Sequence, residues 1–158
     1  MMNLGQNLVW GKSAVSFTKK ALTMGPSNKL SNMGLRPLMC VNMMRGSPSP
    51  MKKNNMYDHI RSWAARARHF KCGNCAEHAA VAFVFLHDRG ILPIHYMAFL
   101  GKGDHGFVVI GRKTGSSDGS LASWGPNAIV CDPYKDKCYP VMHNPSLVNA
   151  KTIWSFPR

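Results

Sequence analysis

Three short segments in the second half of this chain supply a thiol, an imidazole and a carboxylate, in that order along the sequence. A thiol attacks an acyl carbon only as the thiolate, so it needs a base or a helix N-terminus beside it, and the base needs a group that holds its ring. Cys75, His105 and Asp132 have these three chemistries. They predict nucleophilic catalysis at an acyl carbon, with Cys75 as nucleophile, His105 as base and acid, and Asp132 as orienting carboxylate.

Cys75 is expected where a loop becomes a helix. Gly73 and Asn74 interrupt one helical pattern, and a second pattern starts at Cys75. Free backbone N–H groups and the positive end of the helix dipole favour a thiolate at such a position. The same N–H groups, with the Asn74 side chain, could stabilise an oxyanion. The alternative is a small buried cysteine with no chemical role.

His105 and Asp132 are expected at the ends of two strands. His105 follows a glycine-containing turn and begins the apolar run to Ile110, while Asp132 ends a short apolar run before Pro133. A carboxylate at the end of one strand can reach an imidazole on the neighbouring strand and fix its tautomer. Taken singly, each has an ordinary explanation as a hairpin histidine or a turn aspartate. Only the combination with Cys75 indicates a catalytic triad.

The elements around these residues indicate an α+β fold. Apolar residues recur every three or four positions from Tyr57 to His69, which predicts an amphipathic helix. A second helix, from Cys75 to about Asp88, is apolar on all sides and is therefore expected at the centre of the domain. Strands over 91–100 and 104–110, joined by a turn at 101–103, form a hairpin, with a third strand at 128–131 and a further element near 139–143. We expect the cysteine-bearing helix to pack on a small antiparallel sheet.

Charge divides the chain into two parts. The net charge is +13, and no Asp or Glu precedes Asp58, whereas eight Lys and Arg lie in that stretch. This predicts a basic, acid-free leader over residues 1–56, weakly ordered or peripheral, and a catalytic domain over 57–158. A solvated leader needs no ligand, although contact with nucleic acid, an anionic membrane or a secretion apparatus is also compatible with its charge.

The five cysteines do not indicate a disulfide framework, because their number is odd and no signal peptide is visible. A reducing compartment is the better expectation. Zinc is the alternative use for them, but Cys131 and Cys138 are too far apart for the usual second pair. Cys75-Ala76-Glu77 is similar to the zinc motif of cytidine deaminases, whose second motif is missing here. We therefore expect neither a metal nor a cofactor.

Four motifs together resemble a known enzyme group: Gly-Asn-Cys-x-Glu-x-Ala from Gly73, Asp-His-x-Phe-Val-Val-Ile-Gly from Asp104, Trp-Gly-Pro from Trp124, and Val-Cys-Asp-Pro-Tyr from Val130. They are similar to the papain-like or transglutaminase-like cysteine enzymes of bacterial toxins and effectors. The strongest similarity is to glutamine deamidase domains of the Pasteurella multocida toxin type. The resemblance covers roughly 72–139 and implies a papain-like fold with the same triad, and substrate or oxyanion contacts from Asn74 and Trp124.

The function that the resemblance implies is deamidation of a glutamine side chain in a target-cell protein. A papain-like protease or a transglutaminase would use the same triad, and a basic nucleic-acid-binding or interaction module is the non-enzyme alternative. The implied partners are a protein with a reactive glutamine and a secretion apparatus or cognate inhibitor. The implied setting is secretion or injection without a classical signal peptide, followed by action in a reducing cytoplasm.

Overall fold

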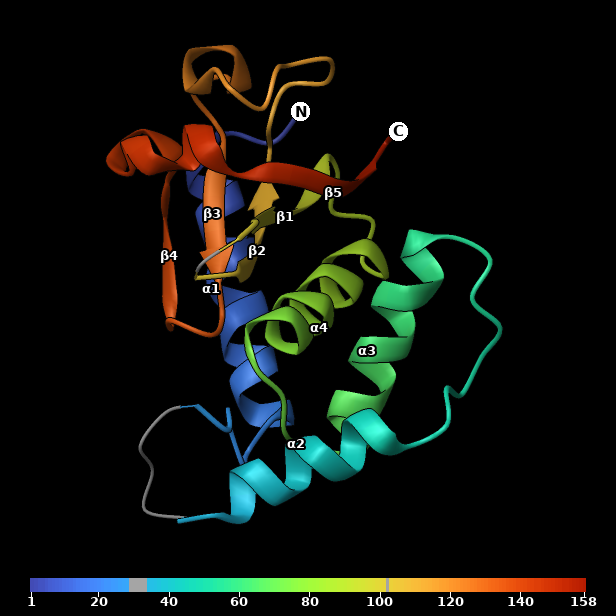
Figure 1. Ribbon diagram of the computed structural model, residues 1–158. Coiled ribbons are helices and arrows are strands. Elements are labelled where there is room, and N and C mark those ends of the chain that lie inside the picture. The colour runs from blue at the N-terminus through green and yellow to red at the C-terminus, as the bar shows by residue number, and fades with distance from the viewer. Residues whose placement is uncertain (29–33, 102) are drawn as a thin grey trace.

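The computed structural model describes residues 1–28, 34–101 and 103–158 as an α+β fold (Figure 1). Its α-helices are α1 (Leu4–Ala21), α2 (Arg36–Gly46), α3 (Met56–Phe70) and α4 (Cys75–His87). Its strands are β1 (Ile94–Phe99), β2 (His105–Ile110), β3 (Ile129–Asp132), β4 (Lys137–Pro140) and β5 (Lys151–Phe156). They form one sheet in the order β4-β3-β2-β1-β5, with every neighbouring pair antiparallel.

The central strands β1, β2 and β3 are buried on both faces, and successive side chains along each strand point to opposite faces. In β2, Val108 and Ile110 face the helices, whereas Phe107 and Val109 belong to a second apolar cluster. The second cluster is completed by the loop segments on the far face, among them the 3₁₀ turns Leu121–Trp124 and Pro145–Asn149. The strands β2 and β3 are therefore apolar along most of their length, as is typical of strands buried on both faces.

The helix α4 lies at the centre of the domain, as its sequence predicts. It packs on β1 and β2, while α3 covers its outer side and α1 lies beside it over β3 and β4. Nine of its residues are buried, among them Phe83 and Leu86. The hairpin of β1 and β2 and the short strand β3 confirm the antiparallel sheet expected from residues 91–131. Lys102, in the middle of the expected turn, lies outside the described residues.

The expectation of a weakly ordered or peripheral leader over 1–56 differs from the structure. α1 begins at a capping box formed by Asn3 and Gln6 and packs against the sheet. An added Cβ at Gly11 would lie 2.5 Å from Cys138 Sγ, so the helix backbone nearly touches β4. Ala14 and Val15 belong to the same apolar cluster as α4. Residues 29–33 of this region lie outside the described residues.

The cysteines also differ from the expectation of five reduced thiols. Cys40 in α2 and Cys72 before α4 form a disulfide, which leaves Cys75, Cys131 and Cys138 as free thiols. This bond connects the first part of the chain to the loop that precedes Cys75. The strand β5 was not anticipated either, although its sequence is rich in β-branched and aromatic residues. No helix in the described part of the chain is long and apolar enough to cross a bilayer.

Candidate active site

Cys75 is the first residue of α4, so its thiol lies at the helix N-terminus. Asn74 occupies the position before the helix, and its backbone N–H donates to Glu77 Oε2 at 2.8 Å. Glu77 also accepts two hydrogen bonds from Arg45 of α2, at 2.9 and 3.0 Å. These contacts fix the start of the helix, and they give the only glutamate of the chain a structural place rather than a position facing the thiol.

The thiol of Cys75 has an environment that favours its ionised form. Its pKa is lowered mainly by a hydrogen bond with His105, and burial opposes this effect. The backbone N–H groups of Gly106 and Ala76 lower the pKa further. In the neutral form the thiol lies 3.7 Å from the Asp104 carbonyl oxygen. The balance of these effects favours a thiolate, the form that attacks acyl carbons.

His105 is positioned from the opposite side by Asp132. The distance from His105 Nε2 to Asp132 Oδ2 is 2.7 Å, and both residues are buried. Burial by itself lowers the pKa of His105, but hydrogen bonds to Asp132 and Cys75 outweigh it and raise the pKa to about 9. Because Nε2 is used by Asp132, Nδ1 is the nitrogen left for the sulfur. The three residues therefore form the continuous chain Cys75, His105, Asp132.

Asp132 is itself held in place at the end of β3. Its second oxygen, Oδ1, accepts from the backbone N–H of Lys135 at 3.1 Å. The ring of Tyr134 lies edge-on to His105, with 5.5 Å between ring centroids, and Phe107 stacks near the same imidazole at 6.2 Å. Sequence reasoning did not assign these aromatic neighbours a role. The sequence feature that could have indicated Tyr134 is its place directly after Asp132-Pro133.

Gly106 allows α4 to approach β2 closely enough for the thiol and imidazole to meet. A Cβ there would lie 3.2 Å from Tyr96 Oη and 3.5 Å from Ala76 Cα. Tyr96 in turn donates from its hydroxyl to the Ala76 carbonyl oxygen at 3.0 Å. The first turn of α4 is therefore fixed to β1 and β2 immediately behind the sulfur.

A cavity of about 200 Å³ adjoins the thiol and the imidazole. Besides Cys75 and His105, its wall is largely apolar and comes mainly from three elements or their ends: Trp63 of α3, Tyr96, Ala98, Phe99 and Leu100 of β1 and the following residue, and Ile153 of β5. An apolar wall with reactive groups at one side is typical of a small ligand site. The contributions of α3 and β5 could not be anticipated from the motifs.

Of the two expected oxyanion or substrate contacts, Asn74 lies beside Cys75, whereas Trp124 lies away from the triad. Asn74 is adjacent to Cys75, and its side-chain oxygen accepts from the backbone N–H and hydroxyl of Ser27, at 2.9 and 3.1 Å. Trp124 is fully buried on the far face of the sheet, where its Nε1 donates to the Ser117 carbonyl oxygen at 2.7 Å. It does not line the cavity beside Cys75.

The loop that follows α1 contacts the segments next to Cys75 and Asp132. Ser27 contacts Asn74 as described, and Asn28 accepts a 2.8 Å hydrogen bond from the Tyr134 hydroxyl. The backbone of Gly25 pairs with Cys72 in an isolated parallel bridge. The first part of the chain therefore helps to position residues on either side of the triad.

The four cysteines considered for a zinc site are not brought together. Cys72 is bonded to Cys40, and Cys131 and Cys138 face each other across β3 and β4. Within the described ranges, no group of three or more His, Cys, Asp or Glu side chains has an arrangement suited to a metal ion. No family model, curated protein or solved structure matches this chain.

Proposed function

We propose that this protein is a cysteine-dependent amidohydrolase with a papain-like arrangement, and that it converts a glutamine side chain of a target protein to glutamate. The observation that carries the proposal is that Cys75 and His105 line the same cavity while the His105 imidazole is hydrogen-bonded to Asp132. The pKa directions of the thiol and the imidazole support a thiolate–imidazolium pair. The choice of glutamine among acyl substrates is supported by the resemblance to toxin deamidases.

The first half of the reaction uses the ion pair directly. The Cys75 thiolate attacks the carboxamide carbon, and the developing oxyanion is stabilised by backbone N–H groups at the start of α4. The His105 imidazolium then donates its proton to the departing nitrogen. Ammonia leaves, and the acyl group remains on Cys75 as a thioester.

Water completes the reaction. Neutral His105 now takes a proton from a water molecule, and the resulting hydroxide attacks the thioester carbon. The sulfur leaves as the thiolate and the imidazolium is restored, so amide and water have become carboxylic acid and ammonia. Asp132 holds the imidazole and stabilises its charged form in both halves. The apolar cavity beside the thiol suits the methylene groups of the glutamine stem.

Mass spectrometry of treated target-cell protein tests this proposal. An extract is incubated with the purified protein or with the Cys75→Ser variant, and the peptides are compared. We expect particular glutamines to gain about one dalton only with the unmodified protein, because an amide nitrogen is exchanged for oxygen. New chain termini that depend on Cys75 would replace the deamidase with a protease. Identical peptides from both samples would contradict an amidohydrolase.

A further inference from the structure

The helix α2 buries one apolar face, and its exposed side carries Leu and Met side chains together with Arg36 and Asn42. The inward residues are Pro37, Cys40, Val41 and Met44. The outward residues Leu35, Leu38, Met39 and Met43 are 72%, 45%, 62% and 64% exposed. Three of them, Leu35, Met39 and Met43, follow one another at four-residue intervals, so they lie on one side of the helix. Single exposed apolar side chains are ordinary, but a row of them indicates an interaction surface.

This outward row is held firmly in place. The Cys40–Cys72 disulfide and the paired hydrogen bonds of Arg45 with Glu77 fix α2 to the start of α4. Arg66 of α3 donates to the carbonyl oxygens at the end of α2, the shortest contact being 3.1 Å to Ser47. The exposed apolar row is therefore a fixed feature of the folded surface.

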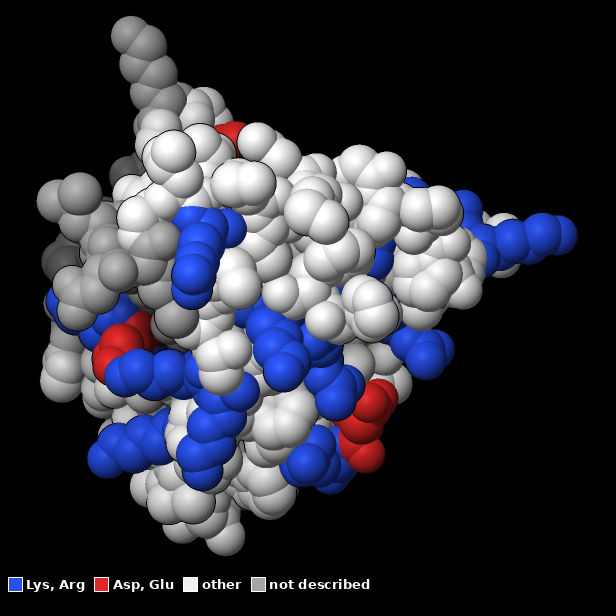
Figure 2. All heavy atoms as spheres, turned by 90° about the horizontal axis from the view of Figure 1, so that it is seen from below, with Lys and Arg blue, Asp and Glu red and all other residues white. Residues whose placement is uncertain are grey.

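A group of cations lies at the C-terminal ends of α1 and α3. The C-terminal ends of α1 and α3 point toward α2, and between them lies a groove of about 730 Å³ whose lining includes Lys20, Arg68 and Lys71. No carboxylate of the described residues forms an ion pair with these three side chains. Figure 2 shows Lys and Arg gathered in a band on this face, with acidic side chains at both ends of the band, beside a broad area that carries few charges. We call the four outward residues of α2 with these three cations the lower face.

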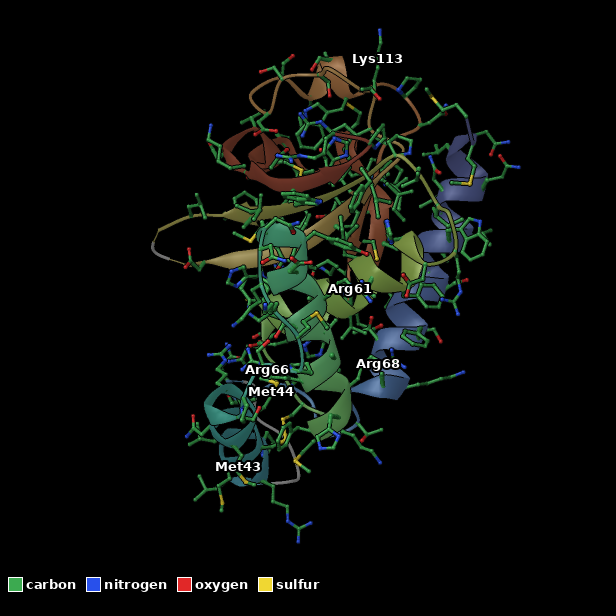
Figure 3. All side chains as sticks on the ribbon, turned by 90° about the vertical axis from the view of Figure 1, so that its right-hand side faces the viewer. Met43, Met44, Arg61, Arg66, Arg68 and Lys113 are labelled. Carbon is green, nitrogen blue, oxygen red and sulfur yellow. A yellow bond between two sulfur atoms is a disulfide. The ribbon has the colours of Figure 1, made fainter. Side chains whose placement is uncertain are left out.

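The lower face projects at one end of the molecule. Figure 1 shows α2 at the extremity opposite β5, and Figure 3 shows Met43 at one end and Lys113 at the other. A projecting apolar row suits the boundary between lipid headgroups and acyl chains, and flanking cations suit anionic headgroups. Nucleic acid would use the cations but not the Leu and Met row, which offers no aromatic ring for base stacking.

We propose that the lower face binds the surface of an anionic lipid bilayer. Leu38, Met39 and Met43 enter the headgroup boundary, while Arg68 and Lys71 lie against the anionic headgroups. The proposal goes beyond the chemistry at Cys75 and does not depend on it. It would bring the enzyme to protein substrates at a membrane.

Sedimentation with lipid vesicles tests the proposal on the full chain. We expect binding to mixed phosphatidylcholine and phosphatidylserine vesicles, little binding to phosphatidylcholine alone, and a decrease as salt is raised. Arg68→Gln with Lys71→Gln should weaken partitioning about tenfold or more, since each cation near the surface contributes. Met39→Gln with Met43→Gln should weaken it about tenfold through loss of apolar contact.

Matched controls lie at the opposite end of the molecule. Lys113→Gln with Lys151→Gln removes the same charge, and Met142→Gln removes a methionine that is 62% exposed outside α2. Both should bind vesicles as the unmodified protein does. Equal loss in the controls, no binding to the mixed vesicles, or binding to RNA in place of vesicles would overturn the proposal. Alkylation of Cys75 reports folding of each variant and tests the active site separately.

Discussion

At Cys75, two opposing influences decide the state of the thiol. Burial favours the neutral form, whereas His105 and the N–H groups of Gly106 and Ala76 favour the thiolate, and the second group prevails. The same hydrogen bond helps to raise the pKa of His105 to about 9, together with Asp132. His105 therefore stays charged through neutral pH and loses its proton only as the pH rises through about 9.

Replacement of Asp132 by Asn tests this account of His105. The variant keeps the shape of the side chain but removes the charge, so the pKa of His105 should fall from about 9 toward or below its ordinary value of 6.5. An NMR titration of the imidazole protons measures the change. Asp136→Asn is the matched control, because Asp136 is exposed in the adjacent turn and its loss should leave His105 unchanged. An unchanged titration in Asp132→Asn would contradict the role of the carboxylate.

The sequence predicts the three chemical groups but not what surrounds them. Cys75 begins α4, His105 begins β2 and Asp132 ends β3, and the apolar runs and turn residues beside them indicate these boundaries in the sequence. The Gly106 N–H, the ring of Tyr134 and the cavity wall from Trp63 and Ile153 depend on contacts between distant segments. Trp124 belongs to a conspicuous motif, yet it is fully buried on the far face of the sheet.

Among the elements, α1 is the least visible in the sequence. Its inward positions include Asn7, Gly11, Ala14 and Thr18, which are small or polar, so no apolar stripe marks the face that packs on the sheet. α2 is difficult to recognise for a different reason: Leu and Met residues lie on its exposed side as well as on its buried side, so the sequence does not show which side packs inward. Helix α3 follows a clear periodicity, and α4 and strands β1 to β3 stand out as apolar runs bounded by turn residues, so these elements are predicted well. Their tertiary partners, including β5, are not specified by local pattern.

Two glycines of α1 test whether this helix belongs to the core. At Gly11 an added Cβ would lie 2.5 Å from Cys138 Sγ and 2.7 Å from Ile129 Cδ1, so Gly11→Ala should lower the free energy of unfolding by about 1–3 kcal/mol. At Gly5 the nearest atom is 3.4 Å away, so Gly5→Ala should raise it by up to about 1 kcal/mol through helix propensity. Urea denaturation measures both. Equal effects at the two positions would contradict the packing of α1.

The contact between Arg45 and Glu77 connects α2 to the start of α4. Burial raises the pKa of Glu77, but Arg45 and the N–H of Asn74 outweigh it and lower the pKa below the ordinary 4.5. Such a carboxylate adds stability above its ordinary pKa, and this is lost as the pH falls through the lowered value. Arg45→Met should therefore reduce the free energy of unfolding by about 2 kcal/mol near neutral pH.

The pH dependence supplies the control for that variant. The difference between Arg45→Met and the unmodified protein should shrink as the pH falls below about 4.5, because the unfolded chain takes up a proton at Glu77 there while the folded protein does so only at its lowered pKa. Arg36→Met, at the exposed start of the same helix, should have little effect at either pH. Denaturation curves at several pH values give both results. A difference that does not depend on pH would contradict the ion pair as its source.

For the whole molecule, the Cys40–Cys72 disulfide joins regions 32 residues apart. Alkylation of the denatured, unreduced protein should label three cysteines, and labelling after reduction should reach five. Reduction should lower the free energy of unfolding by about 3.5 kcal/mol, because the loop of the unfolded chain is released. Five labels without reductant would contradict the disulfide. The odd cysteine count concealed this bond, since one pair and three free thiols also give five.

The most direct test of the catalytic assignment is the pH dependence of Cys75 alkylation by iodoacetamide, followed by mass spectrometry of the Cys75 peptide. Burial raises the pKa of Cys131 and of Cys138, so these thiols serve as internal references. We predict that Cys75 reacts at pH values below the ordinary thiol pKa of 9.0, and that His105→Ala moves its profile upward toward that value. A profile near 9.0 that is the same with and without His105 would contradict the thiolate–imidazolium pair.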